Sequence, residues 1–139
     1  MSTKIHLRTD RRGHPLTFAV TPGHAREAPL LPVLLETGAV RRRHGRPRTR
    51  PARVVGDKAY TGQQTRQYLH RRHIGAVIPR RRNETRRGVR FDRDAYRERN
   101  TIERLIGRLK QHRAIATRYD KRKESYHALL TIAAILLWL

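Results

Sequence analysis

The chain has 139 residues, a length that suits one domain or part of one. Its 33 Lys and Arg residues outnumber 11 Asp and Glu residues, and the formal net charge of +22 indicates a polyanionic partner, namely nucleic acid. The absence of cysteine excludes disulfides and thiolate metal sites, and the first ten residues lack the apolar core of a signal peptide.

The N-terminal part predicts a β-hairpin followed by a short helix. Apolar residues alternate with polar ones over residues 5–7 and again over 16–20, and residues 10–13 carry turn chemistry. Residues 27–37 are rich in leucine and predict a helix, with Gly38 placed to end it in a left-handed conformation.

Two basic loops are expected, at residues 41–53 and 80–90. The first lacks apolar periodicity, which favours a solvated connector over an ordered phosphate-binding site. Arg80 and Arg81 open the second loop and are its candidates for contact with DNA phosphates.

A strand, a helix and a second strand are predicted between these loops. The strands are residues 54–55 and 74–78, and the helix over residues 62–72 is expected to be capped by Thr61. This order predicts a right-handed crossover with parallel pairing of the two strands.

The next segment predicts one long helix, capped by Asp92 and ending near residue 113. Its apolar stripe is Ile102, Leu105, Ile106 and Leu109.

Four polar side chains recur along the same predicted helix. At about 100° per residue, they project within an arc of roughly 60°. They could direct an acid flanked by cations towards a ligand, or belong to a solvated helix with ordinary ion pairs such as Arg99 with Glu103. The four residues are Tyr96, Arg99, Glu103 and Lys110.

The last predicted helix covers residues 125–139, with Ser125 as its N-cap. It is apolar on nearly every face but shorter than the roughly twenty residues that a bilayer requires. We therefore expect a buried core helix.

Asp57 and Glu103 are the candidate catalytic acids. Asp57 follows a short apolar strand, at the edge of an α/β sheet where sites gather. Together the two carboxylates would suit Mg²⁺ and the attack of water or a 3′-hydroxyl on a phosphodiester. Alternatively, Asp57 is a turn residue or an ion-pair partner of Lys58.

The eight histidines show no zinc-ligand spacing.

These residues lie in motifs that resemble the DDE-type insertion-sequence transposases of bacteria, in particular insertion-sequence family five. The signature Y-x-x-R-x-x-x-E-x-x-x-x-x-x-K is matched without a gap by Tyr96, Arg99, Glu103 and Lys110, and the GDKAY motif by residues 56–60. TKIHL, ATRYDK and AILLWL are also similar to family members, so the resemblance covers nearly the whole chain.

The resemblance implies an α/β fold, with an RNase H-like mixed sheet flanked by helices. Asp57 and Glu103 would be the second and third acids of the triad and would bind two divalent ions, Mg²⁺ or Mn²⁺. Arg99 and Lys110 would contact phosphates at the transposon end, and Tyr96 would support the site or the DNA. The complete enzyme would cut transposon ends and join them to target DNA.

One departure concerns the first acid, which family members carry on an initial strand before TKIHL. Asp10 is a poor substitute because it falls in the predicted hairpin turn. We therefore expect residues 1–139 to form a single partial catalytic domain lacking its first strand, encoded by a truncated gene or by the second frame of a frameshifted element. Such a chain would be inactive alone.

The expected partners are DNA, the product of an upstream reading frame and, in the complete enzyme, further copies of the chain. The expected location is the bacterial cytoplasm, at the nucleoid, without membrane contact. The alternative function is that of a non-enzymatic basic nucleic-acid-binding protein, such as an inhibitor of the full transposase.

Overall fold

The computed structural model describes residues 2–84, 90–117 and 122–139 and has an α/β fold. It divides into two compact units. One unit, the hairpin unit, contains Met1–Gly23 and Asn100–Leu139; the other, the central unit, is His24–Arg99. Part of the second predicted basic loop and of the ATRYDK motif lies outside the described residues.

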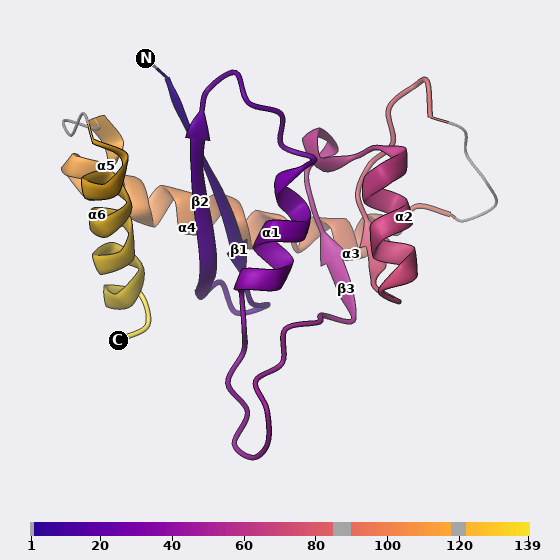
Figure 1. Cartoon of the computed structure of the whole chain (residues 1–139), viewed down its shortest axis with the longest axis horizontal. Helices are drawn as coiled ribbons and strands as arrows, with labels where there is room; N and C mark the ends of the chain where they lie inside the picture. Colours follow the sequence, from indigo (N-terminus) through magenta and orange to yellow (C-terminus); the bar gives the residue numbers. More distant parts are fainter. Residues whose placement is uncertain (1, 85–89, 118–121) are drawn as a thin grey trace. The chain divides into compact units, whose positions relative to one another are not determined.

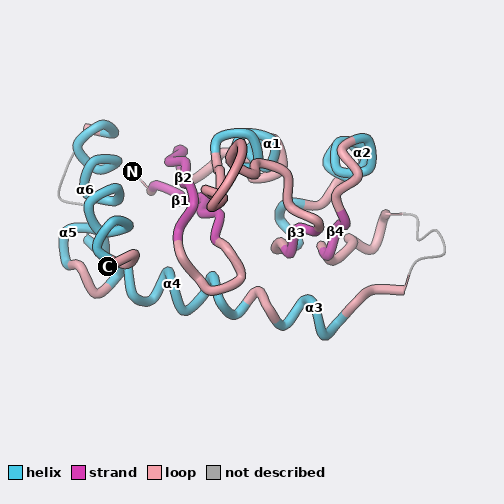
Figure 2. The backbone as a smooth tube through the Cα atoms, turned by 90° about the horizontal axis from the view of Figure 1, so that it is seen from below, coloured by secondary structure: helices cyan, strands magenta, loops and turns pink. Residues whose placement is uncertain are grey.

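The elements follow the chain order shown in Figures 1 and 2. They are β1 Thr3–Thr9, β2 Pro15–Pro22, α1 Leu30–Thr37, β3 Arg53–Val55, the 3₁₀ turn η1 Lys58–Tyr60, α2 Gln63–Arg71, β4 Gly75–Val77, α3 Arg93–Arg97, α4 Asn100–Lys110, α5 Arg113–Thr117 and α6 Lys123–Leu136.

The predicted hairpin is confirmed in the hairpin unit. Strands β1 and β2 pair antiparallel, with Leu7 opposite Phe18. The turn between them uses Gly13 at φ +88°, a left-handed conformation that glycine adopts without strain. One face of the hairpin enters a core with α4, α5 and α6. The buried members of this core are Leu7, Val20, Leu105, Leu109, Ile115, Tyr126, Leu130 and Ala133.

The predicted long helix is wrong as a continuous element. Its apolar stripe is confirmed, since Leu105 and Leu109 are buried on α4. However, α3 ends at Arg97 and α4 begins at Asn100. The amides of Glu98 and Arg99 donate to carbonyls three residues back, as in a tight turn rather than an α-helix.

The interruption changes the geometry of the four signature residues. Tyr96 lies in α3 and Arg99 in the turn, whereas Glu103 and Lys110 lie in α4. The predicted single helical arc therefore holds for Glu103 and Lys110 alone. The helix also ends earlier than expected, at Lys110.

The expectations for the last helix need two corrections. Helix α6 begins at Lys123 with Arg122 as its N-cap, so Ser125 is an interior residue and not a cap. One face of α6 is buried, through residues at helical spacing such as Tyr126 and Leu130. The other face is exposed: Ile132 and Ile135 are both 56% accessible. Within the described ranges, no helix is long and apolar enough to cross a membrane.

The central unit begins with α1, which is shorter than predicted. Residues 27–29 form a turn instead, with the Leu30 amide donating to the carbonyl of Glu27. Gly38 follows the helix at φ −86° and ψ 128°, so it is extended and not left-handed as expected. The helix gives Leu31 and Leu35 to a core completed by Leu69, Ile74 and Ile78.

The predicted parallel pair is confirmed in the same unit. Strands β3 and β4 pair in parallel, with Val54 opposite Ala76, and α2 connects them. Thr61 is not the N-cap of α2, because Gly62 occupies that position and the Thr61 hydroxyl has other partners. The described strands thus form one two-stranded sheet in each unit.

Candidate active site

Asp57 stands at the carboxyl edge of the parallel pair. It follows β3 after Gly56, whose amide donates to the carbonyl of Val77 and so extends the pairing beyond the strand. The Asp57 carbonyl accepts a hydrogen bond from the Tyr60 amide, which fixes the backbone at the start of η1. The side chain is therefore held at the edge where ligands bind in open α/β sheets, and it is 56% exposed.

The structure brings Arg99 and Tyr96 to Asp57, although 42 residues separate Arg99 from the acid. An Nη1 atom of Arg99 lies 3.5 Å from Oδ2 of Asp57. The same guanidinium lies over the ring of Tyr96, 5.5 Å from its centroid. The ring of Phe91 lies 5.3 Å from that of Tyr96. Three predicted site residues therefore form one group within the central unit.

A second ion pair holds the turn after α3 against the strand that leads to Asp57. An Nη2 atom of Arg53, in β3, lies 2.8 Å from Oε1 of Glu98. Glu98 and Arg99 are neighbours in sequence, and their partners Arg53 and Asp57 lie at the two ends of β3. In one pair the turn supplies the acid, Glu98, and in the other it supplies the cation, Arg99. The two contacts fix the orientation of the turn, so that Arg99 points towards Asp57.

Arg80 and Arg81 emerge from the same sheet edge as Asp57. Val55 and Val77 are partners in the parallel register, so the chain leaves both strands at the same level. Both arginines are exposed. A basic segment therefore begins at the sheet edge that carries Asp57.

The segment that follows these arginines is anchored by Glu84. Its Oε2 accepts a hydrogen bond from the Thr61 hydroxyl at 2.9 Å and faces Nε of Arg66 at 3.3 Å. Arg66 also donates to the Thr61 hydroxyl and to the carbonyl of Ile78. Burial would raise the pKa of Glu84, but the hydrogen bonds from Thr61 and Arg66 outweigh it and lower the pKa below its usual value.

Tyr60 adds a neutral polar group near Asp57. Burial raises the pKa of Tyr60 to about 12, and the negative charges of Glu27 and Asp57 add to the rise. The phenol therefore keeps its proton at neutral pH.

Glu103 and Lys110 belong to α4 in the hairpin unit, whereas Asp57 belongs to the central unit. Glu103 lies in the first turn of α4 and Lys110 is its last residue, and both are exposed. Lys110 is seven positions after Glu103, so the two share one face of the helix about 10 Å apart along its axis. Helix α4 therefore carries an acidic and a basic side chain on the same exposed face.

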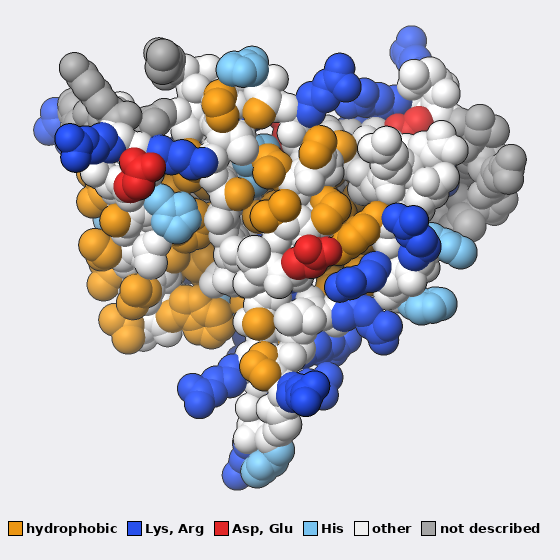
Figure 3. Space-filling view, viewed as in Figure 1, with side chains coloured by type: hydrophobic (Ala, Val, Ile, Leu, Met, Phe, Trp, Pro, Cys, Tyr) orange, Lys and Arg blue, Asp and Glu red, His pale blue; other side chains and the backbone are white. Residues whose placement is uncertain are grey.

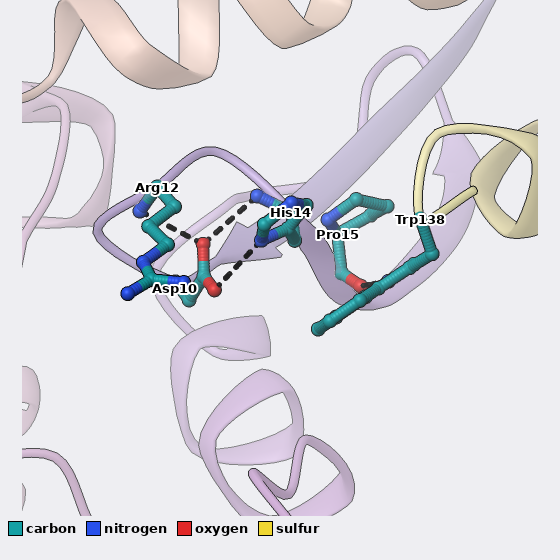
Figure 4. A network of polar contacts seen from close by, with 5 residues as sticks. All are labelled: Asp10, Arg12, His14, Pro15 and Trp138. Atoms are coloured by element: carbon teal, nitrogen blue, oxygen red, sulfur yellow. Dashed lines mark hydrogen bonds and ion pairs between the residues drawn. The ribbon is translucent and has the colours of Figure 1, made fainter.

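Asp10 has a structural role in the hairpin turn (Figure 4). Its Oδ1 accepts hydrogen bonds from the amides of Arg12 and His14, and its Oδ2 lies 3.1 Å from Nδ1 of His14. The His14 ring stacks on Trp138 at 4.5 Å, and the Trp138 indole donates to the carbonyl of Pro15. Both oxygens of Asp10 are thus used by the turn.

The donor set at the sheet edge fits a hard divalent cation. Carboxylate oxygens are preferred ligands of Mg²⁺ and Mn²⁺, which usually keep several waters and need few protein ligands. The exposed carboxylate of Asp57 leaves room for such a shell. Within the described ranges, no three His, Asp or Glu side chains lie close enough together to hold a metal ion by themselves.

Sequence patterns did not identify the groups that support this site. Neither the Arg53–Glu98 pair nor the Thr61–Arg66–Glu84 cluster has a local motif, because each glutamate lies 18 to 45 residues from its partners. Tyr60 did carry a signal, since it belongs to the GDKAY motif.

Comparisons with known proteins find similarity along nearly the whole chain. The model of the family described as "Transposase DDE domain" matches residues 1–138. A Brucella ovis protein named as a transposase for insertion sequence element IS6501 is 31% identical over 140 residues, an alignment that covers 100% of this chain and 99% of that protein. No solved structure gives a significant match. The family model spans nearly all of the sequence, and the chain therefore belongs to the DDE transposase family.

Proposed function

We propose that Asp57 and Glu103 are the second and third acids of a DDE active site in an RNase H-like catalytic domain. The observation that carries the proposal is the position of Asp57 at the carboxyl edge of β3 and β4, with the Arg99 guanidinium 3.5 Å away. The ion-pair partner of Asp57 is Arg99, 42 residues along the chain, rather than its neighbour Lys58. Membership of the transposase family supports the same assignment.

The proposed reaction is cleavage at a transposon end followed by strand transfer into target DNA. When bound, two divalent ions, Mg²⁺ or Mn²⁺, would lower the pKa of the attacking hydroxyl and neutralise charge on the phosphate. Asp57 and Glu103 would hold the ions through carboxylate oxygens. Arg99 would pair with the phosphodiester and limit the repulsion between DNA and the acids.

The proposed DNA contacts lie around these acids. Arg99 and Lys110 would bind phosphates at the transposon end, and Tyr96 would support Arg99 through the ring contact already described. Arg80 and Arg81 would bind phosphates where the chain leaves β4. DNA is the partner that belongs to a transposase, and the net charge of +22 suits it.

The first acid of the triad is proposed to come from outside this chain. Asp10 cannot serve without losing the turn, since both of its oxygens are engaged there. The product of an upstream reading frame is the proposed source, as in an element of insertion-sequence family five in which this chain is the C-terminal part. The complete enzyme would act as a homo-oligomer at the nucleoid.

Strand transfer by the chain supplied with the upstream product tests the proposal. Asp57→Asn and Glu103→Gln should each lower Mn²⁺-dependent strand transfer by about a hundredfold or more. The matched controls are Asp94→Asn, an exposed acid of α3, and Glu124→Gln, an acid in the first turn of α6. Both should retain activity. Strand transfer by Asp57→Asn at the rate of the controls would contradict the assignment.

A second arm tests the source of the first acid. Residues 1–139 alone should not cleave DNA. Robust Mg²⁺-dependent cleavage by this chain alone, lost in Asp57→Asn, would place all three acids within it.

A further inference from the structure

The segment between α1 and β3 is closed into a finger. Val40 and Arg48 exchange both of their backbone hydrogen bonds, each 2.8 Å long, as an antiparallel pair does. Seven residues lie between them, and Gly45 turns the chain there at φ +85° with open space around its Cα. We call residues 40–48 the basic finger. It extends beyond the ends of the two elements that it joins (Figure 1).

The basic finger stands on the ordered part of the central unit. Beyond its closing pair, the Arg48 side chain donates to the carbonyl of Arg50, and the Ala52 carbonyl accepts from the amide of Gly75 in β4. The chain then enters β3 directly. The exit of the finger is therefore tied to the sheet whose other end carries Asp57.

The finger is rich in arginine and exposed to solvent. Every residue from 39 to 50 is exposed, and Lys and Arg side chains line this loop in Figure 3. No Asp or Glu occurs within it to neutralise them. Its arginines are Arg41, Arg42, Arg43, Arg46 and Arg48.

From this arrangement we propose that the basic finger is a contact site for the sugar-phosphate backbone of duplex DNA, separate from the active-site residues named above. Arginine guanidinium groups match phosphate geometry with two parallel hydrogen bonds. The finger has no Phe, Tyr or Trp side chain for stacking on unpaired bases, so it favours a duplex over a single strand.

This inference deepens the proposed function by naming a second DNA contact, and its test is independent of catalysis. Binding of a labelled duplex is measured by fluorescence anisotropy in the presence of a chelator, over a series of salt concentrations. Because the chelator removes divalent ions, the measured affinity for DNA does not depend on whether Asp57 and Glu103 bind metal.

The decisive variant replaces Arg42, Arg43 and Arg46 together by Gln. Its matched control replaces Arg113, Arg122 and Lys123 by Gln, which removes the same charge from exposed positions of the hairpin unit. The finger variant should flatten the slope of log affinity against log salt by about two to three units, at about 0.9 per phosphate. The control should change the slope by less than one unit. Equal slopes for the two variants would contradict the proposal.

Two further comparisons test whether binding depends on the closed backbone of the finger as well as its charge, and whether the finger prefers duplex to single-stranded DNA. Val40→Pro removes one closing amide donor without changing the charge, and duplex affinity should fall several-fold while the melting temperature stays near that of the wild type. A single strand of the same length should compete less well than the duplex. Unchanged affinity in Val40→Pro, or a finger-dependent preference for the single strand, would overturn the assignment.

Discussion

Arg99 and Asp57 form an ion pair in which Nη1 and Oδ2 are 3.5 Å apart, and the pair joins the turn after α3 to the carboxyl end of β3. The contact is long and the Asp57 side chain is 56% exposed, so it contributes at most about 1 kcal/mol to stability. Because Arg99 binds Asp57 only weakly, a divalent metal ion can displace its guanidinium from the carboxylate. This relationship predicts competition between Arg99 and metal.

Replacing Arg99 by Gln should therefore tighten Mn²⁺ binding in the absence of DNA. The expected increase is about two- to fivefold, the equivalent of up to about 1 kcal/mol. Free Mn²⁺ during a titration can be measured by electron paramagnetic resonance. Arg97→Gln is the control, since Arg97 pairs with the exposed Asp94. Weaker Mn²⁺ binding in Arg99→Gln would show that Arg99 supports the ion and does not compete with it.

The hairpin turn should lose stability in acid through Asp10. Burial would raise the pKa of Asp10, but hydrogen bonds from His14 and Arg12 and the charge interaction with His14 lower it below the unfolded value of 3.8. Its contribution to the free energy of unfolding is therefore complete above pH 3.8 and is lost as the pH falls through the folded pKa.

Asp10→Asn tests this dependence by urea unfolding at a series of pH values. At neutral pH the variant should be less stable than the wild type by about 1–2 kcal/mol. The difference should shrink as the pH falls below 3.8. A stability difference that stays constant down to the lowest pH would show that ionisation of the Asp10 carboxyl does not stabilise the turn.

Trp138 should fasten the C-terminal end of the chain to the same turn. Its indole stacks on His14 and donates to the Pro15 carbonyl at 2.9 Å. Trp138→Ala should lower the free energy of unfolding by about 1–2 kcal/mol, and Trp138→Phe by about half as much because stacking remains. Leu139→Ala, at a residue 97% exposed, is the control and should have no measurable effect. Equal stability of Trp138→Ala and the control would exclude the fastening.

The Glu84 cluster should stabilise the central unit. Glu84→Gln leaves Arg66 without its carboxylate partner and weakens the bond from Thr61, so the free energy of unfolding should fall by about 1–3 kcal/mol. Glu36→Gln is the comparison, because Glu36 is an exposed acid whose contact with Tyr68 an amide oxygen can keep. The denaturant midpoint of unfolding should fall clearly in Glu84→Gln and only slightly in Glu36→Gln. Similar small losses in the two would mean that the cluster is solvated.

Periodic patterns predicted the parts of the fold whose cause is local. The hairpin, the apolar stripe of α4 and the parallel pair β3–β4 each follow from alternation or helical spacing that buries one face. The Asp92 cap is equally local, since its carboxylate accepts from the Ala95 amide three residues later. Such features depend on neighbours within one element or its closest partner.

The errors have tertiary causes. Residues 96–110 carry a continuous helical pattern, yet Arg53 in β3 and Asp57 just after it pair with the two residues at the break. Thr61 has the chemistry of an N-cap, but Glu84 takes its hydroxyl. The final helix is apolar all round, so its sequence could not tell the buried face from the exposed one.

The candidate site was predicted from local spacing and from motifs together. Asp57 was named because it follows a predicted strand and lies in the GDKAY motif, and Tyr96 and Arg99 because of their helical spacing and the family signature. The structure brings these three residues together. The direct contact between Arg99 and Asp57 was not predicted, because the continuous helix placed Arg99 beside Glu103.

Thermal unfolding with and without Mn²⁺ tests the central claim, that Asp57 and Glu103 are metal ligands, most directly. The melting temperature of the wild type should rise with millimolar Mn²⁺, because a ligand that binds the folded state stabilises it. Asp57→Asn and Glu103→Gln should lose this rise while their metal-free stability changes by less than about 1 kcal/mol, and Asp94→Asn and Glu124→Gln should keep it. An intact Mn²⁺ response in Asp57→Asn and Glu103→Gln, with clear destabilisation of the metal-free proteins, would contradict the claim and make these carboxylates part of the scaffold.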